Sequence, residues 1–110
     1  MHGMSLEMKA CIDKCLACYK ECLSTAMNHC LELGGENTKP DHFRLMMACA
    51  EICRTSAHFM LMNSEHHKHV CKECAEICRL CAADCDRIGG MDACVTLCRE
   101  CSHSCAAMAA

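Results

Sequence analysis

The most regular apolar positions in this 110-residue chain recur every three or four residues and are occupied by cysteine. In the segment from Cys71 to Cys85, CKECAEICRLCAADC, the cysteines are separated by 3, 4, 3 and 4 residues, and most residues between them are charged or small. This is the spacing of a helix that buries one narrow stripe against its neighbours. The pattern predicts helices whose buried stripe carries thiols where leucine is the usual residue.

Glycine pairs and polar turns mark where the predicted helices begin and end. The first helix should run from about Ser5, a suitable N-cap, to Leu33, because Gly34-Gly35 follows. The loop ENTKPD comes next, and its Thr38 and Pro40 are well placed to open a second helix that ends near Met62.

The second half of the chain predicts two more helices. Ser64 follows a tight bend and can cap a helix that reaches about Ile88, where Gly89-Gly90 breaks the chain; the last helix covers about Asp92 to Met108. Short links between helices of similar length predict an all-α fold, an antiparallel up-down four-helix bundle with a cysteine-lined core, as one domain over residues 1–110. Helical hairpins in a larger assembly fit the pattern less well.

The cysteine stripe is an internal repeat. The first and last helices share gaps of 4, 3 and 4, the third helix is shifted by one step, and the second helix carries only two cysteines. Fourteen cysteines are predicted on these stripes: Cys11, Cys15, Cys18, Cys22, Cys49, Cys53, Cys74, Cys78, Cys81, Cys85, Cys94, Cys98, Cys101 and Cys105. Of the remaining two, Cys71 begins the third stripe and Cys30 is expected off to the side near the end of the first helix.

Composition narrows the class of protein. Sixteen cysteines, about 15% of the chain, exceed what marks a small secreted disulfide scaffold. Such scaffolds are rich in loops, however, and two thiols on one helical face make poor disulfides. With no signal-like N-terminus and no apolar run long enough to span a membrane, the sequence predicts a cytoplasmic protein with reduced thiols. A net charge of −3 without a basic cluster argues against nucleic acid as a partner.

Cysteine can serve as a small hydrophobic core residue, but it fills space less well than leucine and is open to oxidation. Soft thiolates instead select Cu(I), zinc or iron–sulfur clusters. Residues four apart on a helix have Cβ atoms roughly 5–6 Å apart, which suits two sulfurs on one ion with a metal–sulfur bond of about 2.3 Å. A single C-x-x-x-C pair could therefore hold a two-coordinate ion, with a third thiolate from a neighbouring helix.

Charge separates the possible metals. Four Zn(II) ions on sixteen thiolates would leave about eight negative charges buried, whereas one Cu(I) per thiolate leaves none. The predicted stripes contain no lysine or arginine that could offset such charge. Iron–sulfur binding lacks its usual signature, because the chain has no C-x-x-C-x-x-C run. The composition of the core thus favours many monovalent ions.

Two segments, CAEICRLCAADC and CRECSHSCAAMAA, together with the C-x-x-x-C repeats, make nearly the whole chain resemble the bacterial copper storage proteins. The resemblance implies a thiol-lined four-helix bundle that loads multiple Cu(I) ions and associates into tetramers. It also implies the cytosolic branch of the family, since the twin-arginine signal of exported members is missing. The chain departs from that branch in the link DRIGGMDAC, where histidines often occur.

Histidine and methionine residues continue the stripes towards the helix ends, and the up-down topology sorts them into two groups. Imidazole and thioether bind Cu(I) more weakly than thiolate, as suits a transfer site, although these residues could equally be gap-fillers or solvated helix ends. The first group comprises Met4, Met8, Met60, His67 and Met108; the second comprises His29, Cys30, His42, Met46 and Met91. The EHHKH run at residues 65–69 could gather metal or form a polar turn, and His103 is expected on the surface.

The sequence therefore predicts a cytoplasmic, non-enzymatic protein that stores multiple Cu(I) ions. The predicted metal ligands are the sixteen cysteines with His29, His42, His67, Met8, Met46 and Met91. The alternatives are a zinc or general soft-metal reservoir, a dithiol oxidoreductase and a one-ion copper chaperone. An apolar strip on the first helix, Ile12, Leu16, Tyr19 and Leu23, could form subunit contacts in a homo-oligomer or pack within the bundle.

Overall fold

The computed structural model describes residues 4–110, and its helices follow the predicted order. The first long helix is composite: α1 (Leu6–Ser24) continues through a π-helical segment, η1 (Thr25–Cys30), into the short α2 (Leu31–Leu33). A 3₁₀ turn, η2 (Gly35–Thr38), leads into α3 (Pro40–Leu61), which is followed by α4 (His67–Ile88) and α5 (Asp92–Ala109). No strand occurs within this described part of the chain.

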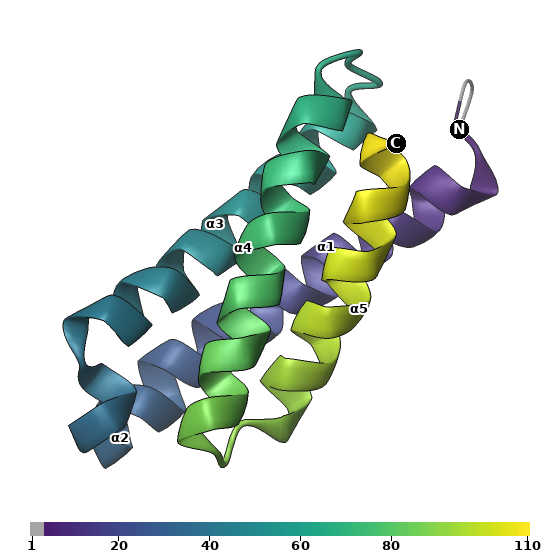
Figure 1. The fold of residues 1–110 in the computed structure, drawn as a ribbon. Helices are drawn as coiled ribbons and strands as arrows, with labels where there is room; N and C mark the ends of the chain where they lie inside the picture. The colour runs from purple at the N-terminus through teal and green to yellow at the C-terminus, as the bar shows by residue number, and fades with distance from the viewer. Residues whose placement is uncertain (1–3) are drawn as a thin grey trace.

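The four long helical stretches form one elongated bundle, about 46 Å long and 21 × 19 Å across. Each helix packs on the next in the sequence, and α5 closes the ring against α1 (Figure 1). The start of α1, the end of α5 and the α3–α4 turn lie at one end, whereas α2, η2 and the α4–α5 link lie at the other. The predicted all-α, antiparallel four-helix bundle is confirmed. Residues 1–3, which we expect to belong to the same domain, lie outside the described residues.

Most of the predicted helix ends are where the sequence signals put them. The Ser5 hydroxyl accepts a hydrogen bond from the Met8 amide at 3.0 Å, so Ser5 is the N-cap of α1. Pro40 occupies the first turn of α3, where a missing amide hydrogen costs nothing. Gly34 and Gly89 follow the ends of α2 and α4 with φ angles of 66° and 88°, a region that favours glycine.

The start of α4 differs from the prediction. The helix begins at His67 with His66 as its N-cap residue, so Ser64 does not cap it. The Ser64 hydroxyl instead accepts a hydrogen bond from the His66 amide at 3.1 Å, inside a turn in which Asn63 has a φ of 54°. The turn after α3 takes two more residues than the serine signal indicated, because the bend itself uses the serine side chain.

Cys30 also differs from the prediction, since it is fully buried in the core instead of lying to the side. A regular α-helix turns about 100° per residue, which would place Cys30 roughly 80° away from Cys22. The π-helical segment underwinds the chain here: the Leu31 amide donates to the Ala26 carbonyl, five residues back. This local change of pitch brings Cys30 back onto the buried stripe of the first helix.

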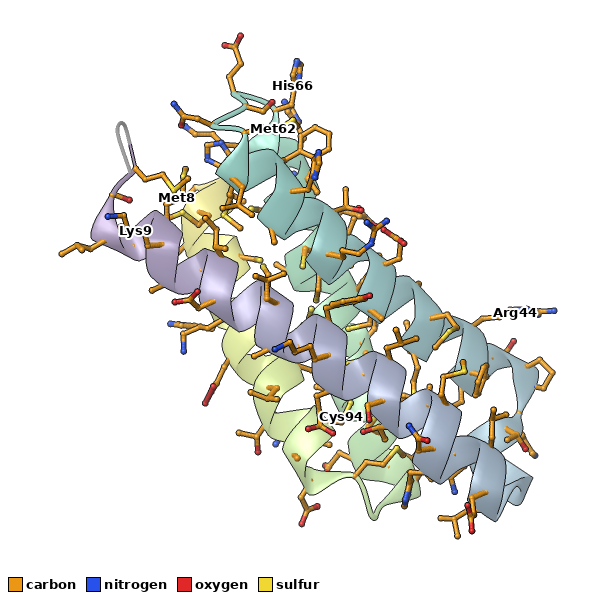
Figure 2. All side chains as sticks on the ribbon, turned by 180° about the vertical axis from the view of Figure 1, so that it is seen from behind. Met8, Lys9, Arg44, Met62, His66 and Cys94 are labelled. Carbon is orange, nitrogen blue, oxygen red and sulfur yellow. The ribbon has the colours of Figure 1, made fainter. Side chains whose placement is uncertain are left out.

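The core consists of sulfur and small side chains. All sixteen cysteines are at most 1% exposed, together with Met46, Met60 and several alanines. Figure 2 shows Lys9 and Arg44 projecting away from the bundle, with Met8 at the same end as Met62 and His66 and Cys94 towards the other end. Among residues 4–110, no helix combines the length and the hydrophobicity needed to cross a membrane.

Candidate metal centre

The cysteine sulfurs contact one another between α1 and α5, between α1 and α3, and between α3 and α4. Between neighbouring helices, the Sγ atoms of Cys15 and Cys105, of Cys22 and Cys94, and of Cys53 and Cys78 are each 3.4 Å apart. Contacts also cross the diagonal from α3 to α5, where the Cys49–Cys98 and Cys53–Cys101 sulfurs are 3.8 Å apart. The centre of the bundle is therefore a filled column of sulfur.

In three of the predicted C-x-x-x-C pairs, the two sulfurs lie at a distance that suits one shared ion, as the sequence analysis expected. The Sγ–Sγ distance within one helix is 3.9 Å for Cys18–Cys22, 3.8 Å for Cys74–Cys78 and 4.0 Å for Cys101–Cys105. With metal–sulfur bonds of about 2.3 Å, two sulfurs sharing one ion lie roughly 4–4.5 Å apart. Small side-chain rotations therefore suffice to place a two- or three-coordinate ion in these pairs.

Four groups of four thiols have all their sulfurs within 4.8 Å of one another. The groups are Cys15/Cys74/Cys101/Cys105, Cys18/Cys49/Cys53/Cys78, Cys18/Cys22/Cys49/Cys98 and Cys53/Cys74/Cys78/Cys101. They overlap, because six cysteines each belong to two of them: Cys18, Cys49, Cys53, Cys74, Cys78 and Cys101. Independent tetrahedral zinc sites need four thiolates of their own. Shared sulfurs suit thiolates that bridge several monovalent ions.

The surroundings of the sulfur column are almost without charge. Within residues 4–110, His42 and Ser56 are the only buried polar side chains, so no lysine or arginine compensates ionised thiols. Burial, followed by repulsion from Cys94 and Cys81, raises the pKa of the Cys30 thiol. The contact with Cys22 lowers the pKa of the Cys94 thiol. Many thiolates can coexist here only with cations between them.

One end of the column changes from thiols to mixed ligands. The Cys30 sulfur lies 3.9 Å from His42 Nε2, 3.7 Å from Met46 Sδ and 3.8 Å from Met91 Sδ. The same thiol also faces the side-chain oxygen of Asn37 at 3.8 Å. We call Cys30, His42, Met46 and Met91 the mixed cluster. It unites four of the five residues that the sequence analysis assigned to this end, and it combines thiolate, imidazole and thioether, all ligands for Cu(I).

His42 is held by a carboxylate that the sequence analysis did not identify. His42 Nδ1 lies 2.7 Å from Asp84 Oδ2, and Arg87 donates two hydrogen bonds to Asp84 Oδ1 at 2.8 and 3.1 Å. Burial raises the pKa of the Asp84 carboxyl, but the hydrogen bonds from His42 and Arg87 outweigh this effect and hold the pKa below its usual value. Asp84 therefore stays ionised at neutral pH.

His29, the fifth residue assigned to this end, faces a different space. It lines a small cavity of about 160 Å³ together with Glu21, Met91 and Cys94. Its Nε2 is buried and makes no hydrogen bond within the described part of the chain. Met91 borders both this cavity and the mixed cluster, so His29 lies beside the cluster without belonging to it.

The opposite end of the bundle brings its predicted ligands together less closely. Met60 is fully buried, Met8 is 8% exposed, and Met4 and Met108 pack against the core from outside. His67 Nδ1 lies 2.7 Å from the Ser64 carbonyl, an arrangement that ties this imidazole to the turn before α4. Cys71 is the outermost thiol here and neighbours Cys11 and Cys105. His103 is exposed, as expected.

The C-x-x-C pairs give no support to a dithiol oxidoreductase. Such an enzyme needs an accessible thiol of lowered pKa, usually at the start of a helix. The best-placed candidates from the sequence, Cys71 and Cys74 in the first turns of α4, are both completely buried. The geometry is that of a sealed sulfur core with a mixed-ligand end.

Comparisons with known proteins agree with this chemistry. The family model described as copper storage protein (Csp) matches residues 4–110. The cysteine-rich protein YhjQ of Bacillus subtilis (strain 168) is 33% identical over 108 residues, which cover 93% of this chain and 95% of that protein.

Among solved structures, the Nmul_A1745 protein from Nitrosospira multiformis shares 53% identity with a TM-score of 0.92 and covers 94% of each chain. Cu(I)-bound copper storage protein BsCsp3 shares 32% identity with a TM-score of 0.87, over 94% of this chain and 99% of that one. Apo-Csp3 from Bacillus subtilis shares 35% identity with a TM-score of 0.77, over 93% and 98% of the two chains. This chain belongs to the copper storage protein family.

Proposed function

We propose that this protein stores and sequesters multiple Cu(I) ions on the thiolates of its core. The observation that carries the proposal is the continuous contact of sulfur with sulfur, across neighbouring helices and across the diagonal, in a core without a buried lysine or arginine. Each Cu(I) cancels the charge of one thiolate, so the core stays close to neutral as it fills. Bound ions are also withheld from redox cycling and from competing metal sites.

The proposed ligands comprise the sixteen cysteines and two sets of weaker groups at the ends of the column. At the α2 end these are His42, Met46 and Met91, with His29 beside them; at the other end they are Met8 and His67. Copper enters through weaker ligands and moves inward by exchange between neighbouring thiolates. Distances of 3.4 to 4.0 Å between successive sulfurs allow an ion to bind its next ligand before it leaves the last.

An anaerobic titration of the reduced protein with Cu(I), in competition with a chromogenic chelator, tests this function. We expect tight uptake of Cu(I) near or above the thiol count of sixteen per chain, and weak binding of Zn(II) in a parallel titration. Saturation at one or two Cu(I) ions would contradict storage and indicate a chaperone.

A zinc reservoir is the second candidate, and the four-thiol groups favour it. Four sulfurs within 4.8 Å of one another can adopt a tetrahedral site with little rearrangement. The shared cysteines and the uncompensated charge count against it. Four tightly held zinc ions per chain, in the same competition experiment, would make zinc the cargo.

We also propose a cytoplasmic location and a homotetrameric assembly. All sixteen thiols are free and buried, as a reducing compartment would keep them. On α1, Leu16, Tyr19 and Leu23 are only partly buried and offer apolar area for a subunit contact, whereas Ile12 is 4% exposed and belongs to the core. Cell fractionation tests the location, and light scattering coupled to gel filtration tests the assembly; a monomer at micromolar concentration would contradict the tetramer.

Storage makes this a binding protein, not an enzyme. Catalysis by cysteine requires a thiolate that reaches its substrate, and each thiol in the core is at most 1% exposed. Absence of thiol–disulfide exchange activity towards a small disulfide substrate is the expected result.

A further inference from the structure

His42 lies between a surface groove and the Cys30 thiol of the mixed cluster. On its outer side it lines a surface groove of about 640 Å³ between the start of α3 and the end of α4, with Leu45, Leu80 and Arg87 among the other lining residues. On its inner side its Nε2 faces the Cys30 sulfur at 3.9 Å. The side chain is 2% exposed. The imidazole therefore lies directly between the groove and the Cys30 sulfur.

The two ring nitrogens of His42 have different partners. Nδ1 lies 2.7 Å from Asp84 Oδ2, and an ionised carboxylate can only accept a hydrogen bond, so Nδ1 carries the proton. Nε2 then keeps its lone pair, on the side of the ring that faces the Cys30 sulfur. A carboxylate that fixes the tautomer and the orientation of a ligating histidine is a recurrent feature of metal sites.

Asp84 is itself held in place. Arg87, one turn later on α4, donates from Nε and from a terminal nitrogen to the same oxygen, Oδ1, which leaves Oδ2 for His42. Arg87 also lies within 3.9 Å of Glu36 in η2, which follows the first helix. The orientation of His42 is thus set by contacts that run through Asp84 and Arg87 to η2 at the same end of the bundle.

We propose that Asp84 is a positioning residue for copper transfer, which keeps the Nε2 lone pair of His42 directed at the mixed cluster so that Cu(I) crosses from the groove to Cys30. This inference rests on the proposed storage function and specifies one port for it. Without the carboxylate, the imidazole can rotate or carry its proton on Nε2. In that form it presents N–H to the thiol and cannot bind an incoming ion.

Two measurements on the same variants test the role of Asp84. The first is the tautomer of His42 in the copper-free protein, from ¹⁵N chemical shifts and couplings of the imidazole ring. The second is the rate at which the first equivalent of Cu(I) passes from a chromogenic chelate to the protein, followed by the final capacity. Asp84→Ala and Asp84→Leu both remove the acceptor, one with a smaller side chain and the other with a larger apolar one, so an effect that they share is due to the lost acceptor and not to a change of volume.

We expect both variants to lose the pure Nδ1–H tautomer and to accept the first equivalent about 10- to 100-fold more slowly, with the wild-type capacity. Asp84→Asn keeps the size of the side chain, but its single oxygen faces Arg87 and its NH2 group faces Nδ1 of His42. This variant should therefore favour the Nε2–H tautomer and load as slowly as Asp84→Ala. The matched control is Asp86→Ala, two residues along on α4, where the carboxylate is exposed and faces Arg99 at 3.6 Å. This control should behave as the wild type.

The inference is overturned if the Asp84→Ala or Asp84→Leu protein keeps the Nδ1–H tautomer or loads at the wild-type rate. An equal slowing in Asp86→Ala would overturn it too, because the effect would then be general surface charge. So would an Asp84→Asn protein that has the Nε2–H tautomer and still loads at the wild-type rate, because the tautomer of His42 would then not control transfer. Failure of storage itself would appear differently, as a wild-type protein that saturates at one or two ions.

Discussion

The thiol of Cys49 on α3 lies 3.8 Å from the thiol of Cys98 on α5, across the diagonal of the bundle. A contact of this length between non-adjacent helices is possible because cysteine is short and no larger side chain intervenes. Cys98 also approaches Cys18 at 3.6 Å and Cys22 at 3.4 Å. One thiol in the middle of the column is therefore in contact with three others from two helices, and its removal should affect every ion that it shares.

Substitution of Cys98 by alanine should lower the Cu(I) capacity by about one or two ions per chain, because an ion bound by two or three thiolates loses a ligand. The free energy of unfolding of the copper-free protein should fall by only about 1–2 kcal/mol, since a single heavy atom leaves the core. Anaerobic Cu(I) titration and urea unfolding measure the two effects.

The control for this substitution is Val95→Ala, one turn earlier on α5. Val95 is 5% exposed and contributes volume without a thiol, so its truncation should cost similar stability and leave the capacity unchanged. Equal capacities for wild type and Cys98→Ala would contradict the sharing of ions in the column.

Copper loading should raise the melting temperature strongly. The core of the copper-free protein is thin, with sulfur and methyl groups in place of large side chains. A ligand that binds only the folded state at 1,000 times its Kd adds about 4 kcal/mol per site, and about 1 kcal/mol corresponds to roughly 4–8 °C in a domain close to this size. Several ions should thus raise Tm by at least about 20 °C. Calorimetry of the protein without Cu(I), with Cu(I), and after removal of the copper by a chelator tests this prediction. A Tm that does not change on loading would place copper outside the core.

Copper uptake should release protons and weaken at low pH. Burial raises the pKa of Cys30. The pKa of Cys71 is raised from 9.0 to about 12, because the contact with Cys11 and burial outweigh the lowering contact with Cys105. Such thiols are protonated at neutral pH, so each bound Cu(I) should displace about one proton. Proton release measured in weakly buffered solution during titration checks this.

The raised pKa of Cys71 also predicts how the stability of the copper-free protein changes with pH. A thiol whose pKa is higher in the folded than in the unfolded state contributes its full stabilisation at pH values below its unfolded-state pKa. This contribution is lost as the pH rises through its folded-state pKa. For Cys71 the window runs from pH 9.0 to about 12. The copper-free bundle should therefore unfold more easily as the pH rises across this window, while the loaded bundle, whose thiols are already deprotonated, should not. Equal pH profiles for the two forms would show that the thiols are not the groups involved.

The spacing of the cysteines was sufficient to predict the bundle and the composition of its core, because gaps of three and four leave only one face of each helix apolar. Two features could not be predicted. The π-helical turn that brings Cys30 inward has no local sequence signal, since Thr25 to Cys30 would also fit an α-helix. The pairing of His42 with Asp84 joins residues 42 positions apart, and it depends on the rotation of α3 against α4, which periodicity does not specify.

The thioethers of the mixed cluster should affect the rate of Cu(I) uptake more than the number of Cu(I) ions bound. Met46 and Met91 lie 3.7 and 3.8 Å from the Cys30 sulfur, the same thiol that His42 faces. Leucine has nearly the same volume, so Met46→Leu and Met91→Leu should cost less than about 1.5 kcal/mol in stability. It cannot bind copper, however, so uptake of the first Cu(I) equivalent should slow while the final capacity falls by one ion at most.

Met47→Leu is the control, because Met47 packs against the core from a neighbouring position of α3 without contacting Cys30. Uptake as fast as in the Met47→Leu protein would show that copper reaches the thiols by another route, through the end near Met8 and His67.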